Sequence, residues 1–170
     1  MIVNKKGFTL MELLIVVIMI SGLVAIVYPS YVSSIERARA SEAVTMLGAI
    51  KAAQEKNYIM YDEYATNFRE IRDFTPALPA QEEGEENFFN LDSNSFRTEY
   101  FIYTMTEEDG NPCVTATRVN PNGQAAGKGY SFIANYMDDF ISCNFTTTDG
   151  DKICSSLTDR SKIGSSYRIY

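Results

Sequence analysis

The sequence predicts an α+β chain in which one long N-terminal helix packs on a C-terminal antiparallel β-sheet. Residues 8–28 are almost all apolar, and residues 30–58 continue with apolar side chains at helical spacing. From residue 97 onward, short apolar or alternating segments are separated by turn residues, which is typical of consecutive antiparallel strands. With 170 residues and 45% apolar content, the chain can form one modest domain besides the helix.

The first apolar segment is long enough to cross a membrane. A helix over residues 8–28 would measure about 31 Å, close to the thickness of about 30 Å of a bilayer core. Lys5 and Lys6 precede it and would stay cytoplasmic by the positive-inside rule. A secretory signal peptide would need a small-residue cleavage site after the run, where no convincing one occurs. A buried core helix would not need so long and uniform a run, whereas a plain membrane anchor fits its length.

Glu12 distinguishes a specialised segment from a plain anchor. A carboxylate inside a membrane helix costs about 2.5–3.5 kcal/mol on insertion scales, so it usually has a partner or a function. A cut between Gly7 and Phe8 would create a positive α-amino group on Phe8, four residues from Glu12 on the same helix face. The Glu12 of a neighbouring subunit could also meet that amine.

The N-terminal sequence KKGFTLMELLIVV, residues 5–17, resembles the class III signal of type IV pilins and type II secretion pseudopilins. The resemblance covers residues 1–43 closely and the rest of the chain by architecture, which would be the pilin fold. It implies cleavage after Gly7 by a prepilin peptidase and N-methylation of Phe8. It also implies that Glu12 neutralises the Phe8 amine of a subunit already in the filament.

Two residues are expected to interrupt the long helix. Gly22 and Pro29 lie in its apolar half, and proline both lacks an amide hydrogen and clashes with the preceding turn. The resemblance to pilins implies a melted stretch near this region, so we expect residues 22–29 to loosen on assembly. The following half should pack on the sheet through one apolar face: Val32, Ile35, Ala43, Met46, Leu47, Ile50 and Ala53.

The chain accordingly divides into five predicted segments. Residues 1–7 form a cleaved leader, residues 8–29 the transmembrane and filament-core half of the helix, and residues 30–60 its amphipathic half. Residues 61–96 form a connecting loop with a short helical piece around residues 67–74. Residues 97–170 form the sheet and a disulfide-bounded C-terminal region, with strands expected at 97–106, 113–119, 130–136 and 140–145. A turn is expected at residues 109–112.

Three cysteines indicate one disulfide in an oxidising compartment. Cys143 and Cys154 bracket a short polar segment that contains the turn signal Asp149-Gly150, and they are expected to close a hairpin-sized loop. Cys113 would then remain as a buried apolar side chain. Pairing of Cys113 with either of the other two cysteines stays open at this point.

The composition speaks against several kinds of chemistry. The chain contains no histidine and shows no identifiable pair of catalytic carboxylates, so nothing indicates an enzyme or a cofactor. Acidic residues near positions 138–151 could bind calcium, but they do not form a complete ligand set. Asn144 begins a glycosylation sequon. The formal charge of −7 would repel phosphate, so nucleic acid is not expected to bind to the bulk surface.

The predicted function is that of a structural subunit of a type IV pilus. The precursor would sit in the cytoplasmic membrane as a single-pass protein, and the mature chain would form a surface filament. Its partners would be further copies of the same subunit, a prepilin peptidase, the pilus assembly machinery and, before assembly, the membrane. A type II secretion pseudopilin and a minor pilin at a filament tip with a ligand-binding role remain as alternatives.

Overall fold

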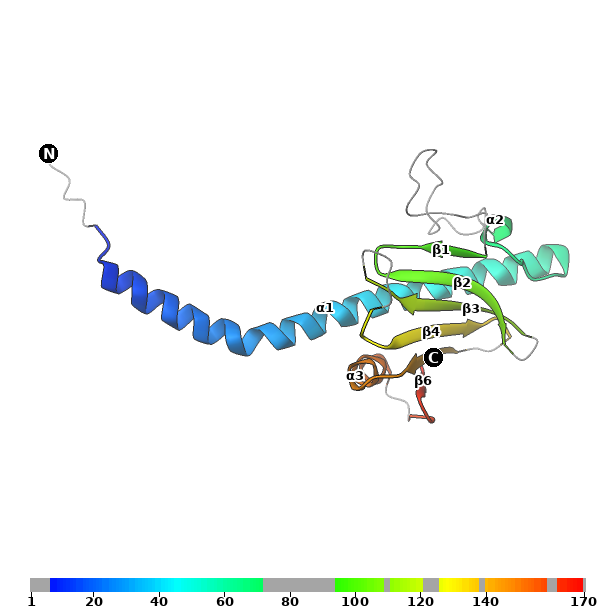
Figure 1. Ribbon diagram of the computed structural model, residues 1–170. Helices are drawn as coiled ribbons and strands as arrows, with labels where there is room; N and C mark the ends of the chain where they lie inside the picture. Colours follow the sequence, from blue (N-terminus) through cyan, green and yellow to red (C-terminus); the bar gives the residue numbers. More distant parts are fainter. Residues whose placement is uncertain are drawn as a thin grey trace, which may run out of the picture. The chain divides into compact units, whose positions relative to one another are not determined.

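The computed structural model describes residues 7–71, 94–108, 111–120, 126–137, 140–158 and 162–169. These residues fall into two compact units that meet between Glu36 and Arg37. We call the first the anchor unit and the second the head, and each is described by itself. Helix α1 (Leu10–Tyr61) contributes to both (Figure 1). The predicted α+β fold, with a long N-terminal helix and an antiparallel sheet, is confirmed.

Specific residues begin and end α1. Thr9 precedes the first helical residue and accepts a hydrogen bond from the backbone N–H of Glu12 through its hydroxyl oxygen. At the other end Asp62 adopts a left-handed conformation with φ 59°, and its N–H donates to the carbonyl of Tyr58 at 2.8 Å. Such a left-handed residue is a common way to satisfy the last carbonyls of a helix. The helix therefore starts two residues after residue 8 and ends one residue after residue 60, the predicted bounds of its two halves.

The sheet of the head is a simple meander in the order β1-β2-β3-β4-β5-β6, and every neighbouring pair is antiparallel. Its strands are β1 (Ser95–Arg97), β2 (Phe101–Glu108), β3 (Asn111–Arg118), β4 (Tyr130–Asn135), β5 (Ile141–Phe145) and β6 (Ser166–Arg168). Strands β2 to β5 match the four predicted strands within a few residues. The predicted turn at 109–112 falls partly on residues 109–110, which lie outside the described residues, whereas Asn111 and Pro112 belong to β3.

Two strands and one helix were not predicted as such. Strand β1 takes up Arg97, because Thr98 and Tyr100 make a tight reversal before β2 in which the N–H of Thr98 donates to the carbonyl of Phe101. Strand β6 adds the last edge of the sheet. Helix α3 (Thr148–Ser156) replaces the hairpin turn expected at Asp149-Gly150. The predicted helical piece at residues 67–74 is present as α2 (Phe68–Ile71), and its last three residues lie outside the described residues.

The core of the head lies between α1 and one face of the sheet. Strand β4 alternates between buried and half-buried residues, as expected for a strand with one covered face. Opposite it, the helix buries residues at intervals of three and four. Of the seven apolar residues predicted to face the sheet, Ala43, Leu47, Ile50 and Ala53 are buried, and Met46 packs partly buried against the core. The prediction was wrong for Val32, which is exposed.

Aromatic side chains fix the edge of the core next to β1. Phe96 stacks on Tyr103 with ring centroids 4.7 Å apart, and Phe68 meets the other side of Phe96 edge-on, also at 4.7 Å. Such pairs add about 0.5–1.5 kcal/mol beyond the burial of their area. They explain why a strand of only three residues and a helix of four residues hold defined positions in the head.

One buried polar side chain joins α1 to the segment that follows it. The Gln54 amide accepts a hydrogen bond from the N–H of Ala65 at 2.8 Å and donates to the carbonyl of Ala65 at 2.9 Å. The same amide donates to the Tyr136 hydroxyl at 3.3 Å. Burial raises the pKa of Tyr136, which therefore keeps its proton at physiological pH. Gln54 thus provides hydrogen-bond partners for the N–H and the carbonyl of Ala65, a buried residue that belongs to no helix or strand.

We predict that Gln54→Ala lowers the free energy of unfolding of the head by about 2–4 kcal/mol, because it leaves the Ala65 amide buried without its partners and removes side-chain volume. Denaturant unfolding of the full chain in mild detergent, followed by near-UV circular dichroism, measures this. The neighbouring exposed substitution Glu55→Ala is the matched control and should change stability by less than about 0.5 kcal/mol. Equal losses from the two variants would contradict the assigned role.

Candidate functional site

The first candidate site is the start of the anchor unit, where Gly7 and Phe8 precede α1 and Glu12 lies in its first turn. The Glu12 carboxylate accepts hydrogen bonds from the Thr9 N–H at 3.0 Å and from the Thr9 hydroxyl at 2.9 Å. The Thr9 hydroxyl in turn accepts from the Glu12 N–H at 3.2 Å. This reciprocal pair is a capping box, in which Glu12 stands at the third helical position. Thr9 was not among the predicted site residues, although the pattern of Thr followed by Glu three residues later signals a capping box.

The capping box holds the Glu12 carboxylate at the end of the helix next to Phe8. A negative charge at that end also interacts favourably with the partial positive charge of the helix N-terminus. In the single chain, helix capping therefore gives Glu12 a role of its own. Phe8, the residue whose amine a cut after Gly7 would expose, precedes Thr9 and is 84% exposed.

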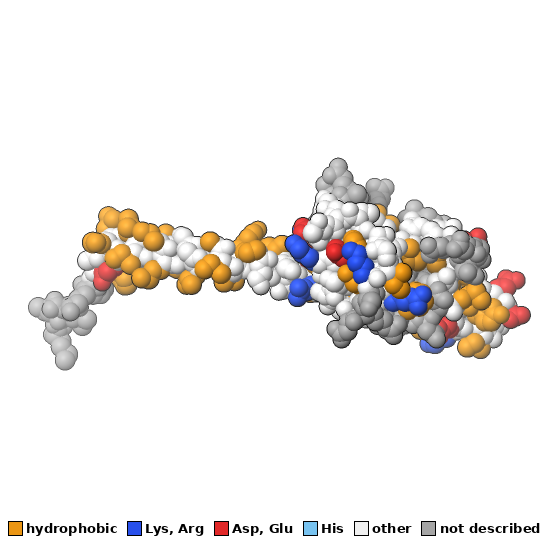
Figure 2. Space-filling model, turned by 90° about the horizontal axis from the view of Figure 1, so that it is seen from below, with side chains coloured by type: hydrophobic (Ala, Val, Ile, Leu, Met, Phe, Trp, Pro, Cys, Tyr) orange, Lys and Arg blue, Asp and Glu red, His pale blue; other side chains and the backbone are white. Residues whose placement is uncertain are grey.

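The apolar residues after Glu12 remain uncovered within the described part of the chain. An 18-residue window of α1 has a mean hydropathy of 2.8 and no buried residue, and α1 is long and apolar enough to cross a membrane. A core helix of a soluble protein would be mostly buried, whereas this segment is exposed among the described residues and could anchor the chain in a membrane. Figure 2 shows hydrophobic side chains along this part of the helix.

Helix α1 is continuous through Gly22 and Pro29, so no stretch is melted there in this structure, and a kink at these residues stays a prediction. Proline cannot donate to the carbonyl four residues earlier, but helices tolerate it where surrounding groups compensate. No atom outside the helix's own backbone lies within 4 Å of the position where a side chain on Gly22 would begin. Loosening of residues 22–29 on assembly stays a prediction.

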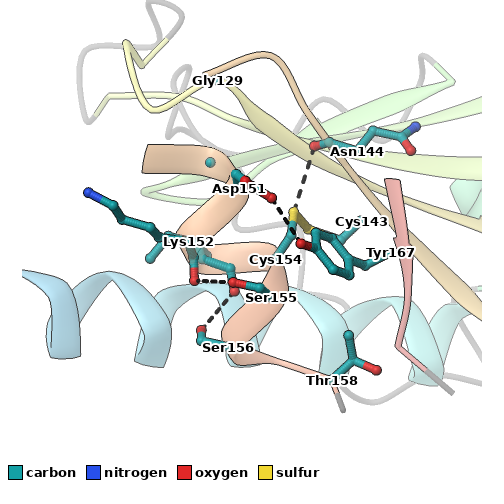
Figure 3. Close-up of a disulfide and its surroundings, with 12 residues drawn as sticks. Gly129, Cys143, Asn144, Asp151, Lys152, Cys154, Ser155, Ser156, Thr158 and Tyr167 are labelled. Atoms are coloured by element: carbon teal, nitrogen blue, oxygen red, sulfur yellow. Dashed lines mark hydrogen bonds between the residues drawn. A yellow bond between two sulfur atoms is a disulfide. The ribbon is translucent and has the colours of Figure 1, made fainter. Parts of the chain in front are cut away.

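The second candidate site is the C-terminal region of the head, where Cys143 on β5 and Cys154 on α3 form a disulfide with a Cα–Cα distance of 5.6 Å (Figure 3). Both cysteines are fully buried. The closed loop contains α3, whose N-terminus is capped by the Thr147 hydroxyl accepting from the Gly150 N–H at 3.1 Å. Asp149 therefore stands in the first turn of a helix, where an acidic residue is favourable, and not in a hairpin turn.

Helix α3 approaches the start of β4 too closely for any side chain at two glycines. A Cβ atom on Gly150 would lie 2.6 Å from the carbonyl oxygen of Gly129. Gly129 itself has φ +57°, and a Cβ there would lie 2.5 Å from the Thr147 methyl group. The Thr146 N–H donates to the carbonyl of Gly129 at 2.7 Å. Helix α3 is therefore held against the sheet by two features, the close approach at Gly129 and Gly150 and the disulfide to β5.

Asp151 organises the outer side of α3. It accepts hydrogen bonds from the Tyr167 hydroxyl at 3.0 Å and from the Lys162 ammonium at 3.3 Å (Figure 3 shows the first). Burial raises the pKa of Tyr167, and Asp151 raises it further. Asp149 lies near Lys152 at 3.7 Å and Lys128 at 4.0 Å. These carboxylates have cationic neighbours, and within the described ranges no group of acidic or cysteine side chains could hold a metal ion. Asp138 and Asp139 lie outside those ranges.

The remaining residues singled out by the sequence have structural surroundings. Cys113 is buried on β3 as a reduced thiol, with its sulfur 3.1 Å from the Thr106 hydroxyl. It does not take part in the disulfide, which settles the pairing that the sequence left open. Asn144, the first residue of the sequon, lies half-buried in β5, where it pairs with Ser166 of β6.

Taken together, the fold and the N-terminal site define a class of protein. A helix that follows Gly7-Phe8-Thr9 and carries a glutamate in its first turn exposes a long apolar segment, and the same chain forms a head with an antiparallel meander. Those are the features of a pilin-like filament subunit, in which an apolar helix serves first in the membrane and then in a polymer.

Comparisons with known proteins define the family. Residues 29–117, slightly more than half of the chain, match the family described as "Type IV minor pilin ComP, DNA uptake sequence receptor". The chain therefore belongs to the type IV pilins, within the family that carries this description. No solved structure matches the chain.

Individual relatives are named as pilus proteins. The chain is 36% identical over 63 residues to a fimbrial protein of Neisseria meningitidis serogroup A, which is 37% of each chain. It is 41% identical over 68 residues to the type IV major pilin protein PilA of Myxococcus xanthus, 40% of this chain and 31% of the relative. The chain thus spans about a third of the length of these two relatives. The type IV major pilin protein PilE of Neisseria gonorrhoeae is 28% identical over 134 residues, 79% of this chain and 70% of the relative.

We predict that the double substitution Cys143→Ser and Cys154→Ser lowers the free energy of unfolding by about 3 kcal/mol, the loop-closure entropy of a bridge of this span. Denaturant unfolding of the oxidised chain and the variant measures it. A reductant should destabilise the unsubstituted chain by a similar amount and leave the variant unchanged. Coinciding unfolding curves for all four samples would contradict a stabilising role of the bridge.

Proposed function

We propose that this protein is a structural subunit of a type IV pilus, inserted in the membrane as a prepilin, cut after Gly7 and polymerised into a helical surface filament. The observation that carries the proposal is the uncovered apolar segment of α1, which begins directly after Gly7, Phe8 and Glu12. In a polymer, packing between the helices of neighbouring copies would replace contact with lipid. The names of the relatives as fimbrial and major pilin proteins support the same function.

The surroundings of Gly7 support its role as a processing signal. A Cβ atom at Gly7 would meet nothing within 4 Å, and its φ is not in the left-handed region. Folding of the chain therefore places no demand for glycine at this position. A requirement for a small residue would come from an external partner, and a peptidase that cuts the bond between Gly7 and Phe8 supplies one. Methylation of the resulting amine would keep its positive charge.

The proposed role of Glu12 in assembly rests on its charge. Its hydrogen bonds to Thr9 explain why a polar residue caps the helix, but glutamine satisfies a capping box as well as glutamate does. A carboxylate at the start of an apolar segment is stabilised where it meets a positive charge in a low-dielectric setting. The Phe8 amine of a neighbouring copy would provide that charge inside the filament.

Capping and assembly can be separated by substitution. We predict that Glu12→Gln, which retains the capping box and removes the charge, leaves cleavage at Gly7 intact and reduces the yield of sheared surface filaments at least tenfold. Thr9→Ala is the matched control, since it removes the hydroxyl of the capping box and keeps the charge, and its filament yield should stay near normal. Membrane levels of the processed chain serve to normalise both yields. Normal filament assembly by Glu12→Gln would refute the charge-pairing role.

The proposed route fixes the partners and the locations of the chain. The precursor would be a single-pass protein of the cytoplasmic membrane, with Lys5 and Lys6 on the cytoplasmic side. A prepilin peptidase and the pilus assembly machinery would act on it there, and copies of the same subunit would surround it in the extracellular filament. The disulfide is consistent with a head that folds on an oxidising side of the membrane.

Neighbouring functions within the superfamily share this fold. A type II secretion pseudopilin would also have the processed N-terminus, but the pilus proteins among the relatives favour a pilus subunit. Whether the chain is a major subunit or a minor one at a filament tip is addressed by the protein composition of sheared filaments. A major subunit would dominate them, whereas a minor subunit would be a small fraction beside another pilin.

A second candidate function is DNA binding, because the matching family is described as a DNA uptake sequence receptor. The electrostatics of this chain oppose binding over its bulk surface, since its net charge is −7. Lys128, Lys152 and Lys162 each lie within 4.0 Å of an aspartate carboxylate, which weakens their attraction for phosphate. DNA recognition would therefore depend on a local surface.

Fluorescence anisotropy with labelled DNA duplexes tests this candidate on the purified full chain in detergent. From the net charge we predict no binding at physiological salt with duplexes at up to about 10 μM, a concentration within the usual range of non-specific dissociation constants. Weak binding that appears only at low salt and is the same for a permuted sequence would fit a non-specific contact. Binding at physiological salt that distinguishes the two duplexes would contradict the prediction and establish a receptor function.

A further inference from the structure

The end of α1 in the head carries an exposed apolar cluster that the processing and capping sites do not explain. This cluster, the apolar tip, consists of Tyr58, Ile59, Met60 and Tyr61, all exposed, with Ile59 reaching 82%. Tyr58 stacks on Tyr64 with ring centroids 4.8 Å apart, and this contact holds the tip against the segment that follows α1. Contiguous exposed apolar side chains on a folded domain are typical of a contact surface. Figure 2 shows hydrophobic and acidic side chains together at this end of the head.

An acidic recess adjoins the apolar tip. It has a volume of about 480 Å³ and is lined by Asn57, Tyr61, Glu63, Tyr64, Thr66 and Glu70. The Glu70 carboxylate is oriented by hydrogen bonds from the Thr66 N–H at 2.9 Å and the Asn67 amide at 2.6 Å. The Asn57 amide donates to the carbonyl of Glu63 at 2.8 Å. A preformed recess with two carboxylates and an apolar rim suits a long basic side chain, which can pack its stem and pair its charge.

The opposite end of the head is basic. There Arg39 lies over the Tyr100 ring at 3.9 Å, and Arg118 lies over the same ring at 5.1 Å. Arg37, the first residue of the head, lies two residues before Arg39 on α1 and is exposed. From Arg37 to Tyr61 the helix rises about 36 Å, so the basic end and the apolar tip lie at opposite ends of the head.

The apolar tip with its acidic recess and the basic end are two different surfaces of opposite charge. An open helical polymer requires a heterologous contact, in which one surface of a copy meets a different surface of the next. Contact of two apolar tips would bring like charges together, whereas contact of a tip with a basic end pairs opposite charges and fixes the direction of the contact. An anionic membrane or DNA would be repelled by the acidic recess.

We propose that the apolar tip and acidic recess of one copy receive the basic end of a second copy, with Arg37 entering the recess between Glu63 and Glu70. The proposal rests on the function as a filament subunit and adds a second contact to it, one made by the heads. The occupant of the recess is the same protein, and the charges make the contact directional.

Cysteine cross-linking in filaments of the full chain tests the proposal. We expect the double variant Ile59→Cys and Arg37→Cys, treated with a short bis-maleimide, to give a ladder of covalent multimers. Each single variant should give almost none, because a heterologous contact does not bring two identical positions together. The unsubstituted chain is the background control, since Cys113 is buried and the other two cysteines are bridged. Filaments without a ladder, or dimers from Ile59→Cys alone, would overturn the proposal.

Charge reversal provides a second measurement that does not need cross-linking. Glu63→Arg should lower the yield of sheared filaments about fivefold or more, and adding Arg37→Glu in the same chain should restore most of it. Glu99→Arg, the same charge change at an exposed position of the basic end, is the matched control and should leave the yield unchanged. Loss without restoration, together with no ladder, would exclude the contact. Absence of filaments from the unsubstituted chain would instead reject the proposed function itself.

Discussion

The apolar surface of α1 has to be removed from water along its whole length, and the chain covers only part of it. In the head, Leu47 and Ile50 are fully buried against the sheet. In the anchor unit the most apolar window has no buried residue. Burying one such side chain stabilises by about 1.5–3 kcal/mol, so covering the exposed segment in a membrane or in the proposed polymer would be strongly favourable. The head has its own buried core, whereas the first half of the helix has no buried residue in that window.

This constraint gives Glu12 two roles that do not conflict. In the single chain its carboxylate closes a capping box with Thr9 and so fixes where α1 begins. In the proposed filament the same carboxylate would meet an amine that exists only after the cut at Gly7. The head adds its own polarity, with the apolar tip at one end and arginines around Tyr100 at the other. Apolar contacts between helices alone would leave the axial register of neighbouring copies poorly defined. The proposed charge pairs, one at Glu12 and one between heads, would fix that register.

Much of this could be predicted from the sequence because periodic patterns extend over many residues. The apolar run and the spacing of Ala43, Leu47 and Ile50 predicted α1, and alternating segments predicted β2 to β5. Strands of three residues such as β1 and β6 carry too few positions for a pattern, and tertiary contacts of Phe96 and Tyr167 decide them. Asp149-Gly150 suits a turn and a helix start equally, and the Thr147 cap decides between them. The apolar tip was not predicted, because exposure depends on where the sheet ends.

The most direct measurement is a cryo-electron microscopy map of filaments sheared from cells that express this chain. We expect an N-terminal residue Phe8, an apolar helix buried among those of neighbouring copies, and a Glu12 carboxylate within about 4 Å of the Phe8 nitrogen of another copy, the limit for an ion pair. Filaments in which Glu12 faces only its own Thr9, or in which residues 8–28 are missing from the polymer, would contradict it.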